Sequence, residues 1–340
     1  MDADIRKFIL PGWLWIAIFS LSVLGQISTT PAPQSSRAIS DNPVEDKVQT
    51  LRLNSKLMSR EMPYRVILPP GYSALKFKEP GYSVIYLLHG LTGHFDNWTD
   101  RTKLAEYSAT HKFIIVTPEG DNGWYTDSST ISNDKYESYI IKELIPEIDK
   151  TFRTIPDRDH RAIAGLSMGG YGGLKFGLKY PEMFSLAGSF SGALKAASYS
   201  EKTIGPRGKT VDAILGAENS ETRNANDIFK MIREISSEKI KSLPFLYIDC
   251  GTEDFLFDSN REFVTLLVEK KVRHEYRQLP GAHNWIYWNA QVKEFLEVAG
   301  SRLKKWGIEE RGEPPFLTCQ GCRLNGRFLL DYIFEQAEKN

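Results

Sequence analysis

The stretch from Ile163 to Gly173 constrains the fold of this chain more than any other. It contains the pattern Gly-x-Ser-x-Gly, which is typical of a sharp turn from a buried strand into a helix, with the serine hydroxyl held above the edge of the sheet. Gly165 and Gly169 flank Ser167 because a Cβ at either position would clash where strand and helix nearly touch. The pattern also occurs in glycine-rich turns that merely contain a serine, so its meaning depends on partners elsewhere in the chain.

Strand and helix patterns alternate along most of the chain. Short apolar or alternating runs predict strands at residues 48–53, 64–68, 82–88, 113–116, 161–164, 184–190, 245–248 and 273–279. Helical spacing is found at residues 138–152, 258–271 and 285–304. The first two strands are expected to be antiparallel. The later alternation predicts an α/β fold with a mainly parallel central sheet and helices on both faces.

Two stretches depart from this rhythm. Pro146 falls inside the helical pattern of residues 138–152, where it is expected to kink the helix. Residues 193–242 are polar and irregular at first and helical from about residue 226 to 241. We interpret them as a small cap-like insertion that packs over the strand ends and shapes a pocket.

The N-terminus has the layout of an export signal. Residues 8–24 are almost entirely apolar and follow Arg6 and Lys7, which predicts a signal peptide within residues 1–27 and a secreted or periplasmic protein. The alternative is an uncleaved membrane anchor with the domain outside the cytoplasm, because the run is close to the lower length limit for a span. Residues 28–47, rich in Ser, Thr and Pro, are expected to form a flexible leader.

Residues 306–340 form a C-terminal extension with its own cysteine pair. Cys319 and Cys322 lack a second pair or nearby histidines, so a local disulfide in an exported protein is favoured over a zinc site. Cys250 is interpreted as a small buried apolar residue. No metal ion or other cofactor is predicted.

The charges of the whole chain balance, with 43 Lys and Arg against 43 Asp and Glu. Such a balance does not indicate a nucleic-acid partner or a strongly charged substrate. The sequence does not indicate an oligomeric state.

A nucleophilic serine needs a histidine as base and a carboxylate to orient that base. Of the six histidines, only His274 and His283 follow Ser167. His274 lies in an alternating strand and is expected to face solvent. His283 lies in a loop after that strand, from which a side chain can reach the carboxyl edge of the sheet, and is the predicted base.

The acid is expected in the loop after residues 245–248. Asp249 remains close to the strand, and Asp258 fits better as the N-cap of the next helix. Glu253 and Asp254 differ only in side-chain direction, which the sequence does not give. The residues alone therefore leave the choice between these two open.

Two further loops are predicted to reach the same edge of the sheet. The turn from His89 to Gly93 follows a central strand and can aim a backbone N–H at the crevice, with His89 shaping the loop rather than transferring protons. The loop at residues 122–127 carries Trp124 and Tyr125, which are predicted to contact the substrate.

Five stretches together are far more specific than the serine motif alone: residues 87–93, 122–127, 165–170, 250–254 and 283–285. On these stretches, which lie within residues 62–303, the chain resembles the esterase D family of α/β-hydrolases, most closely its tributyrin-esterase branch. The resemblance implies an α/β-hydrolase fold, and we assign this domain to residues 48–305.

The resemblance also implies a site and an activity. Ser167, Asp254 and His283 would form a catalytic triad, with the N–H groups of Leu91 and Met168 as the oxyanion hole. The implied reaction is hydrolysis of carboxylic esters through an acyl-enzyme, with a preference for short acyl groups.

Two other readings stay open. The first is an esterase acting on acetyl or feruloyl groups of polysaccharides, because Trp98, Trp124, Tyr125 and Trp285 would either stack on a sugar or wall an acyl pocket. The formylglutathione hydrolases of the wider family differ from this chain, because they carry a cysteine at the position of Gly93. The second reading, from another class, is a non-catalytic binding protein on a hydrolase fold. The expected substrate is a small-molecule or polysaccharide-linked ester.

Overall fold

The computed structural model describes residues 47–72 and 81–303. The predicted signal or anchor, all but the last residue of the leader, and the C-terminal extension with its two cysteines lie outside this part of the chain. Among the helices described, none is both long and apolar enough to cross a membrane.

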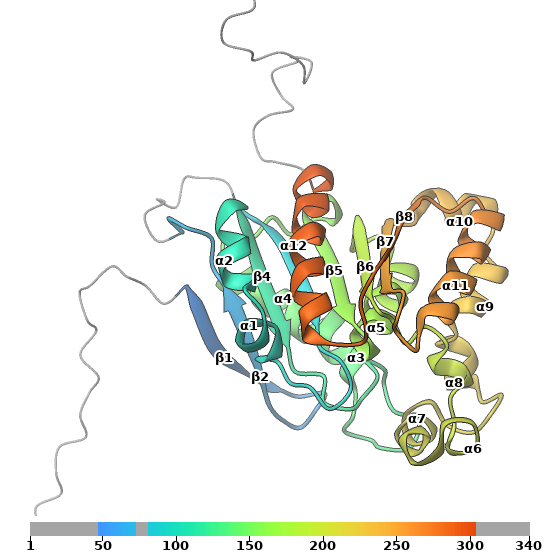
Figure 1. Cartoon of the computed structure of the whole chain (residues 1–340). Helices are drawn as coiled ribbons and strands as arrows, with labels where there is room; N and C mark the ends of the chain where they lie inside the picture. Colours follow the sequence, from blue (N-terminus) through green and yellow to red (C-terminus); the bar gives the residue numbers. More distant parts are fainter. Residues whose placement is uncertain (1–46, 73–80, 304–340) are drawn as a thin grey trace, which may run out of the picture. The chain divides into compact units, whose positions relative to one another are not determined.

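Eight strands form one sheet in the order β1-β2-β4-β3-β5-β6-β7-β8 (Figure 1). Their bounds are β1 Val48–Ser55, β2 Arg60–Ile67, β3 Ser83–Leu88, β4 Phe113–Pro118, β5 Arg161–Leu166, β6 Leu186–Phe190, β7 Phe245–Gly251 and β8 His274–Leu279. The pairs β1–β2 and β2–β4 are antiparallel, and all other pairs are parallel. The predicted mainly parallel sheet with antiparallel opening strands is confirmed.

The central strands are buried on both faces, as their continuous apolar runs predict. Every residue of β3, β4, β5 and β6 is buried. Alternate residues of β3 belong to two hydrophobic clusters, Tyr86 and Leu88 to one and Ile85 and Leu87 to the other. The sheet therefore separates two cores.

Helices cover both faces of the sheet. The core that contains Tyr86 includes residues of α3 (Tyr136–Tyr139), α4 (Ile145–Thr151), α5 (Met168–Lys179) and α11 (Phe257–Glu269). The other core includes residues of α1 (Asn97–Arg101), α2 (Leu104–Tyr107) and α12 (Trp285–Arg302). Figure 1 shows α12 packed in front of the sheet. This is the layered arrangement expected from alternating strands and helices.

The helix predicted at residues 138–152 is divided. A π-helical turn, Ile140–Leu144, separates α3 from α4, and Pro146 lies in the first turn of α4. Because α4 continues directly from the π-helical turn, Pro146 removes one N–H donor to that turn and crowds the carbonyl four residues earlier. The expected disturbance is therefore present, in the turn that precedes the proline.

The insertion between β6 and β7 is more helical than predicted. It contains α6 (Glu201–Ile204), α7 (Gly208–Leu215), α8 (Glu221–Ala225), α9 (Ile228–Arg233) and α10 (Ser237–Ser242). The single helix expected at residues 226–241 is two helices. The reason is local: four side chains in the insertion accept a hydrogen bond from an amide three residues on and so start separate helices, namely Ser200, Ser220, Asp227 and Ser236.

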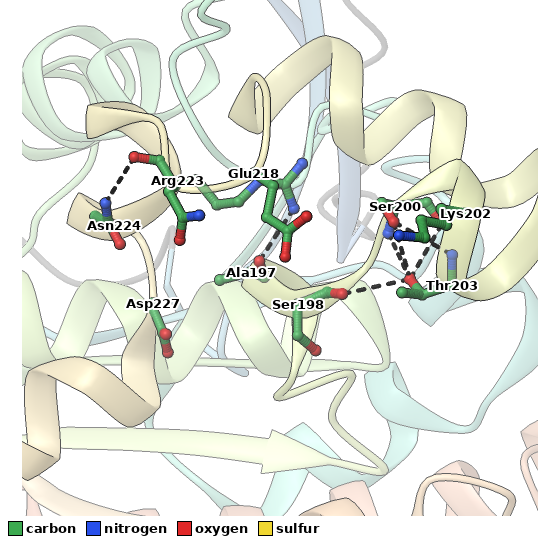
Figure 2. A pocket seen from close by; sticks show the side chains of 10 residues that line it. Ala197, Ser198, Ser200, Lys202, Thr203, Glu218, Arg223, Asn224 and Asp227 are labelled. Atoms are coloured by element: carbon green, nitrogen blue, oxygen red, sulfur yellow. Dashed lines mark hydrogen bonds between the residues drawn. The ribbon is translucent and has the colours of Figure 1, made fainter.

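Arg223 holds the insertion together. Its buried guanidinium donates to the carbonyl oxygens of Ala197, Tyr199 and Gly216 and to the carboxylate of Asp212. Beside it opens a pocket of about 300 Å³ whose walls are mostly exposed polar side chains (Figure 2). Because the Arg223 nitrogens already have protein partners, they are committed to the fold of the insertion rather than to a ligand.

One ion pair is buried beneath the loop at residues 122–127. Lys175 of α5 has no exposed side-chain surface, and its Nζ donates to Glu137 Oε2 at 2.8 Å, to the Tyr125 carbonyl at 2.6 Å and to Thr126 Oγ1 at 2.7 Å. Burial lowers the pKa of Lys175 to about 8, despite the neighbouring carboxylate. Burial alone would raise the pKa of Glu137, but Lys175 and Lys179 lower it to about 2. Both partners are therefore charged at neutral pH.

Replacing Glu137→Gln should lower the free energy of unfolding by about 3–5 kcal/mol, because it leaves the buried Lys175 ammonium without its counter-charge. Urea denaturation at neutral pH measures this. A suitable control is Glu147→Gln, because Glu147 pairs with Lys150, whose side chain is 82% exposed, and such pairs contribute about 0–1 kcal/mol. Equal, small losses in the two variants would contradict this account of the buried pair.

Candidate active site

Ser167 occupies a strained turn between β5 and α5. Its backbone has φ 54° and ψ −115°, a conformation that residues other than glycine rarely adopt. A Cβ on Gly165 would lie 2.5 Å from the carbonyl oxygen of Gly169, and a Cβ on Gly169 would lie 2.5 Å from the carbonyl oxygen of Leu88. Both glycines are thus required by close backbone contacts, as the sequence pattern predicted.

Ser167, His283 and Asp254 lie in a hydrogen-bonded row. His283 Nε2 is 3.0 Å from Ser167 Oγ, and His283 Nδ1 is 2.8 Å from Asp254 Oδ2. The other carboxylate oxygen of Asp254 accepts from the Leu256 amide at 2.9 Å. Burial alone would raise the pKa of Asp254, but the hydrogen bonds from His283 and from that amide outweigh it and hold the pKa below its ordinary value. The carboxylate is therefore ionised and aimed at the imidazole.

The loops that carry Asp254 and His283 are tied to each other. The Glu253 amide donates to the Gly281 carbonyl, and the Thr252 amide donates to the Leu279 carbonyl, each at 2.9 Å. Asn284 then begins α12, because its side chain accepts from an amide in the first turn. These bonds fix the spacing between acid and histidine.

A buried asparagine anchors the acid loop from below. Asn260 of α11 has no exposed surface, and its amide nitrogen donates to the carbonyls of Gly192 and Leu256, each at 2.9 Å. It thereby joins the acid loop to the chain that follows β6. Sequence reasoning missed this residue, since an asparagine inside a predicted helix carries no signal of its own.

The rival candidates occupy other environments. Glu253 and Asp258 are exposed, and Asp258 lies in the first turn of α11, whose N-cap is Leu256. The expectation that Asp258 is the N-cap is therefore wrong, because the helix begins two residues earlier than that cap would require. His274 is half-buried, and its Nδ1 is 2.8 Å from the Val272 carbonyl. None of the three is hydrogen-bonded to His283 or Ser167 in the described part of the chain.

Asp249 is fully buried in β7, and within residues 47–72 and 81–303 neither of its carboxylate oxygens has a hydrogen-bond partner. Burial raises the pKa of Asp249 well above its ordinary value, and the nearby charge of Asp254 adds to this. The hydroxyls of Tyr247 and Tyr287 and the charge of Arg277 act the other way without cancelling it. This raised pKa favours the neutral carboxyl group, which is unsuited to stabilise an imidazolium.

The turn after β3 lies against the serine. A Cβ on Gly90 would lie 3.3 Å from Ser167 Cβ, so this turn passes directly beside the nucleophile position. Its course is set from the loop after β4, because the Thr92 amide donates to Asn122 Oδ1 at 2.8 Å. Leu91, which lies between Gly90 and Thr92 in this turn, is half-buried. Met168 is the first residue of α5, where a helix amide has no intrahelical acceptor.

His89 is part of the scaffold of this turn. Its side chain is 1% exposed, with Nδ1 at 2.8 Å from the Gly90 carbonyl and Nε2 at 3.1 Å from Glu119. Burial alone would raise the pKa of Glu119, but the hydrogen bond and charge of His89 and the amide of Asp121 lower it to about 2. His89 thus holds the loop, in line with its predicted role. Glu119, which the sequence analysis did not single out, is its partner.

The predicted substrate contacts of the loop after β4 need correction. Tyr125 is fully buried, and its hydroxyl donates to the His89 carbonyl at 2.8 Å. Tyr125 therefore supports the turn after β3 from inside the protein and offers no open surface to a substrate. Trp98 is likewise fully buried and donates to the Leu88 carbonyl. Trp124 keeps only 3% of its surface exposed and packs edge-to-face on Tyr171 and Tyr199.

The family model described as "Putative esterase" matches residues 55–297. The chain belongs to this esterase family. The predicted resemblance to the esterase D family of α/β-hydrolases is thereby confirmed. Residues 55–297 include all the side chains placed at the site above.

Individual relatives agree with the family. An acetyl esterase of Caldicellulosiruptor saccharolyticus is 28% identical over 260 residues, which cover 74% of this chain and 97% of that protein. The structure of a ferulic acid esterase is 30% identical with a TM-score of 0.65, covering 76% of this chain and 98% of the other. FphF, a fluorophosphonate-binding serine hydrolase of Staphylococcus aureus, is 26% identical with a TM-score of 0.66, covering 74% and 97%. This esterase is a carboxylic ester hydrolase.

The raised pKa of Asp249 gives this esterase a pH-dependent stability. In the unfolded chain an aspartate ionises above about pH 3.9, whereas burial raises the pKa of Asp249 well above that value in the folded protein. The unfolded state then binds fewer protons, so the stability contributed by Asp249 falls as the pH rises above about 4. We expect the melting temperature of Asp249→Asn, which cannot ionise, to increase relative to that of the wild type as the pH rises above about 4. Melting curves at matched pH measure the difference, and a constant difference would contradict the assignment.

Proposed function

We propose that this protein is a serine carboxylesterase in which Ser167, His283 and Asp254 form the catalytic triad. The observation that carries the proposal is the row of hydrogen bonds from Ser167 Oγ through the imidazole of His283 to the buried carboxylate of Asp254. A base within reach of the hydroxyl, itself oriented by a carboxylate, is what a serine needs to become nucleophilic at neutral pH.

The reaction proceeds in two halves. The Ser167 hydroxyl gives its proton to His283 Nε2 as Oγ attacks the ester carbonyl carbon. Asp254 holds the Nδ1–H and stabilises the imidazolium, which then protonates the departing alcohol oxygen as the ester C–O bond breaks. A water molecule, deprotonated by the same nitrogen, attacks the acyl-enzyme, and Ser167 leaves with its proton restored.

Two amides are proposed as the oxyanion hole. Met168 N–H lies at the start of α5, where the helix dipole favours negative charge. Leu91 N–H belongs to the turn that passes beside Ser167. Together they would donate to the oxygen that becomes negative in the tetrahedral intermediate. The bond from the Thr92 amide to Asn122 supports this role, because it fixes the backbone next to Leu91.

The preferred substrates are proposed to be esters of short acyl groups. The acetyl esterase among the relatives supports this choice. An esterase acting on acetyl or feruloyl groups of polysaccharides is the second candidate, and the similar ferulic acid esterase structure favours it. The intact Ser-His-Asp row counts against the non-catalytic reading. Export, through cleavage of the signal or as an anchored form, stays a prediction.

Ser167→Ala should leave a folded protein whose turnover of a short-chain aryl ester falls by a factor of about 10³ or more. His283→Ala should cost a similar factor. The double variant should be scarcely slower than either single one, because the two residues act as one unit. Initial rates for the three variants measure this, and losses that add in free energy would mean that the pair does not act together.

Asp254→Asn should reduce turnover by about 10⁴, because an asparagine in this place favours the wrong tautomer of His283. The neighbouring Glu253→Gln is the matched control and should retain near-normal activity, since Glu253 is exposed and not bonded to the imidazole in the described structure. Circular dichroism checks that both variants are folded. The reverse pattern would identify Glu253 as the acid.

A further inference from the structure

We propose that Phe255 is a specificity-determining residue that contacts the alcohol half of the ester, and that the enzyme favours esters of cyclic alcohols with an apolar ring face. This inference rests on the proposed function, because it uses the role of His283 as the acid that protonates the leaving group. It adds a residue that contacts the alcohol half of the ester, a part of the substrate on which the triad places no requirement.

Phe255 is conspicuous by its exposure. It directly follows the buried Asp254, yet 72% of its surface is exposed. The other exposed large hydrophobic side chains of the described structure are aliphatic, and of them only Ile286 is more exposed: Ile131, Ile204, Val268, Leu279 and Ile286. An exposed aromatic side chain beside a proposed catalytic group offers apolar surface that a ligand can cover, and removing that surface from water favours binding.

The ring of Phe255 lies against the ring of His283. Their centroids are 4.7 Å apart with an angle of 50° between the planes. The buried Trp288 approaches the same imidazole edge-on, with centroids 4.9 Å apart. The histidine thus contacts one buried and one exposed aromatic ring, and Phe255 is the one of the two that is open to solvent.

The chemistry of the reaction decides which half of the ester meets Phe255. His283 Nε2 must donate its proton to the departing oxygen, so the alcohol has to lie within hydrogen-bond distance of the imidazole. The acyl group, in contrast, remains bound to Ser167. A group that extends outward from the protonated oxygen therefore passes the solvent-side neighbour of His283, which is Phe255.

The two residues next to the acid and the histidine in the sequence favour a ring with one apolar face and polar edges. Glu253 precedes Asp254, Asn284 follows His283, and both are exposed. A flat aromatic surface with polar side chains close to it in sequence suits a saturated ring that stacks one face and presents hydroxyls at its rim. A cyclic alcohol has this shape, whether it is a simple cyclohexanol or a sugar residue.

The test compares two acetates of secondary alcohols with similar leaving groups, cyclohexyl acetate and isopropyl acetate. We expect Phe255→Ala to reduce kcat/KM for cyclohexyl acetate about tenfold more than for isopropyl acetate, because part of the extra ring surface loses its contact. Val268→Ala on α11 is the control, because Val268 is also exposed, at 61%. It should leave the ratio of the two substrates unchanged.

A third substrate, methyl 2-O-acetyl-xyloside, distinguishes a sugar from an apolar cyclic alcohol. A loss on this ester in Phe255→Ala at least as large as on cyclohexyl acetate identifies the sugar as the preferred ring. Equal losses on cyclohexyl and isopropyl acetate would mean that Phe255 only supports His283, and would overturn the inference. Unchanged kcat/KM for both acetates in Phe255→Ala would also overturn it. Absence of any hydrolysis that depends on Ser167 would overturn the proposed function itself, a different result.

Discussion

The close approach of three backbone segments at Ser167 is the constraint on which the site depends. The end of β3, the end of β5 and the first turn of α5 meet with so little space that Gly165 and Gly169 admit no side chain. This contact forces Ser167 into its positive-φ conformation and lifts its hydroxyl out of the helix. It also brings the turn after β3 alongside, so that one packing contact places both the nucleophile and a proposed oxyanion donor. The strain is confined to this turn, and the packing of the buried strands around it keeps the turn in place.

The other half of the site is assembled by bonds between loops. Asp254 and His283 come from the loops after β7 and β8, which are adjacent parallel strands. Parallel neighbours bring their carboxyl ends to the same edge of a sheet, so topology alone puts the two loops side by side. The amide bonds from Thr252 and Glu253 to the second loop then fix their spacing. The order of strands in the sheet therefore explains how His283 reaches Asp254, although the two are 29 residues apart in the sequence.

The sequence predicted those features that follow from short-range patterns. Apolar runs located the strands, and the glycines around Ser167 located the elbow, because backbone contact there excludes any other residue. The helices between residues 193 and 225 were missed, since isolated capping side chains such as Ser200 and Ser220 define helices of a few residues without visible periodicity. Tyr125 was misread because an aromatic residue in a loop near a crevice gives no sign of whether it faces the crevice or the core. The sequence pattern thus predicts where a residue lies along the chain, but not the direction in which its side chain points.

Asp249 and Asp254 show how little separates a structural carboxyl group from a catalytic one. They are five positions apart at the end of the same strand, and burial disfavours the charge of both. The pKa of Asp254 is nevertheless lowered, because an imidazole and a backbone amide donate to it, whereas Asp249 has no such donor in the described structure and its pKa is raised. The charge of Asp254 in turn adds to the raised pKa of Asp249. The acid of the proposed triad is thus selected by its hydrogen-bond donors and not by its depth in the protein.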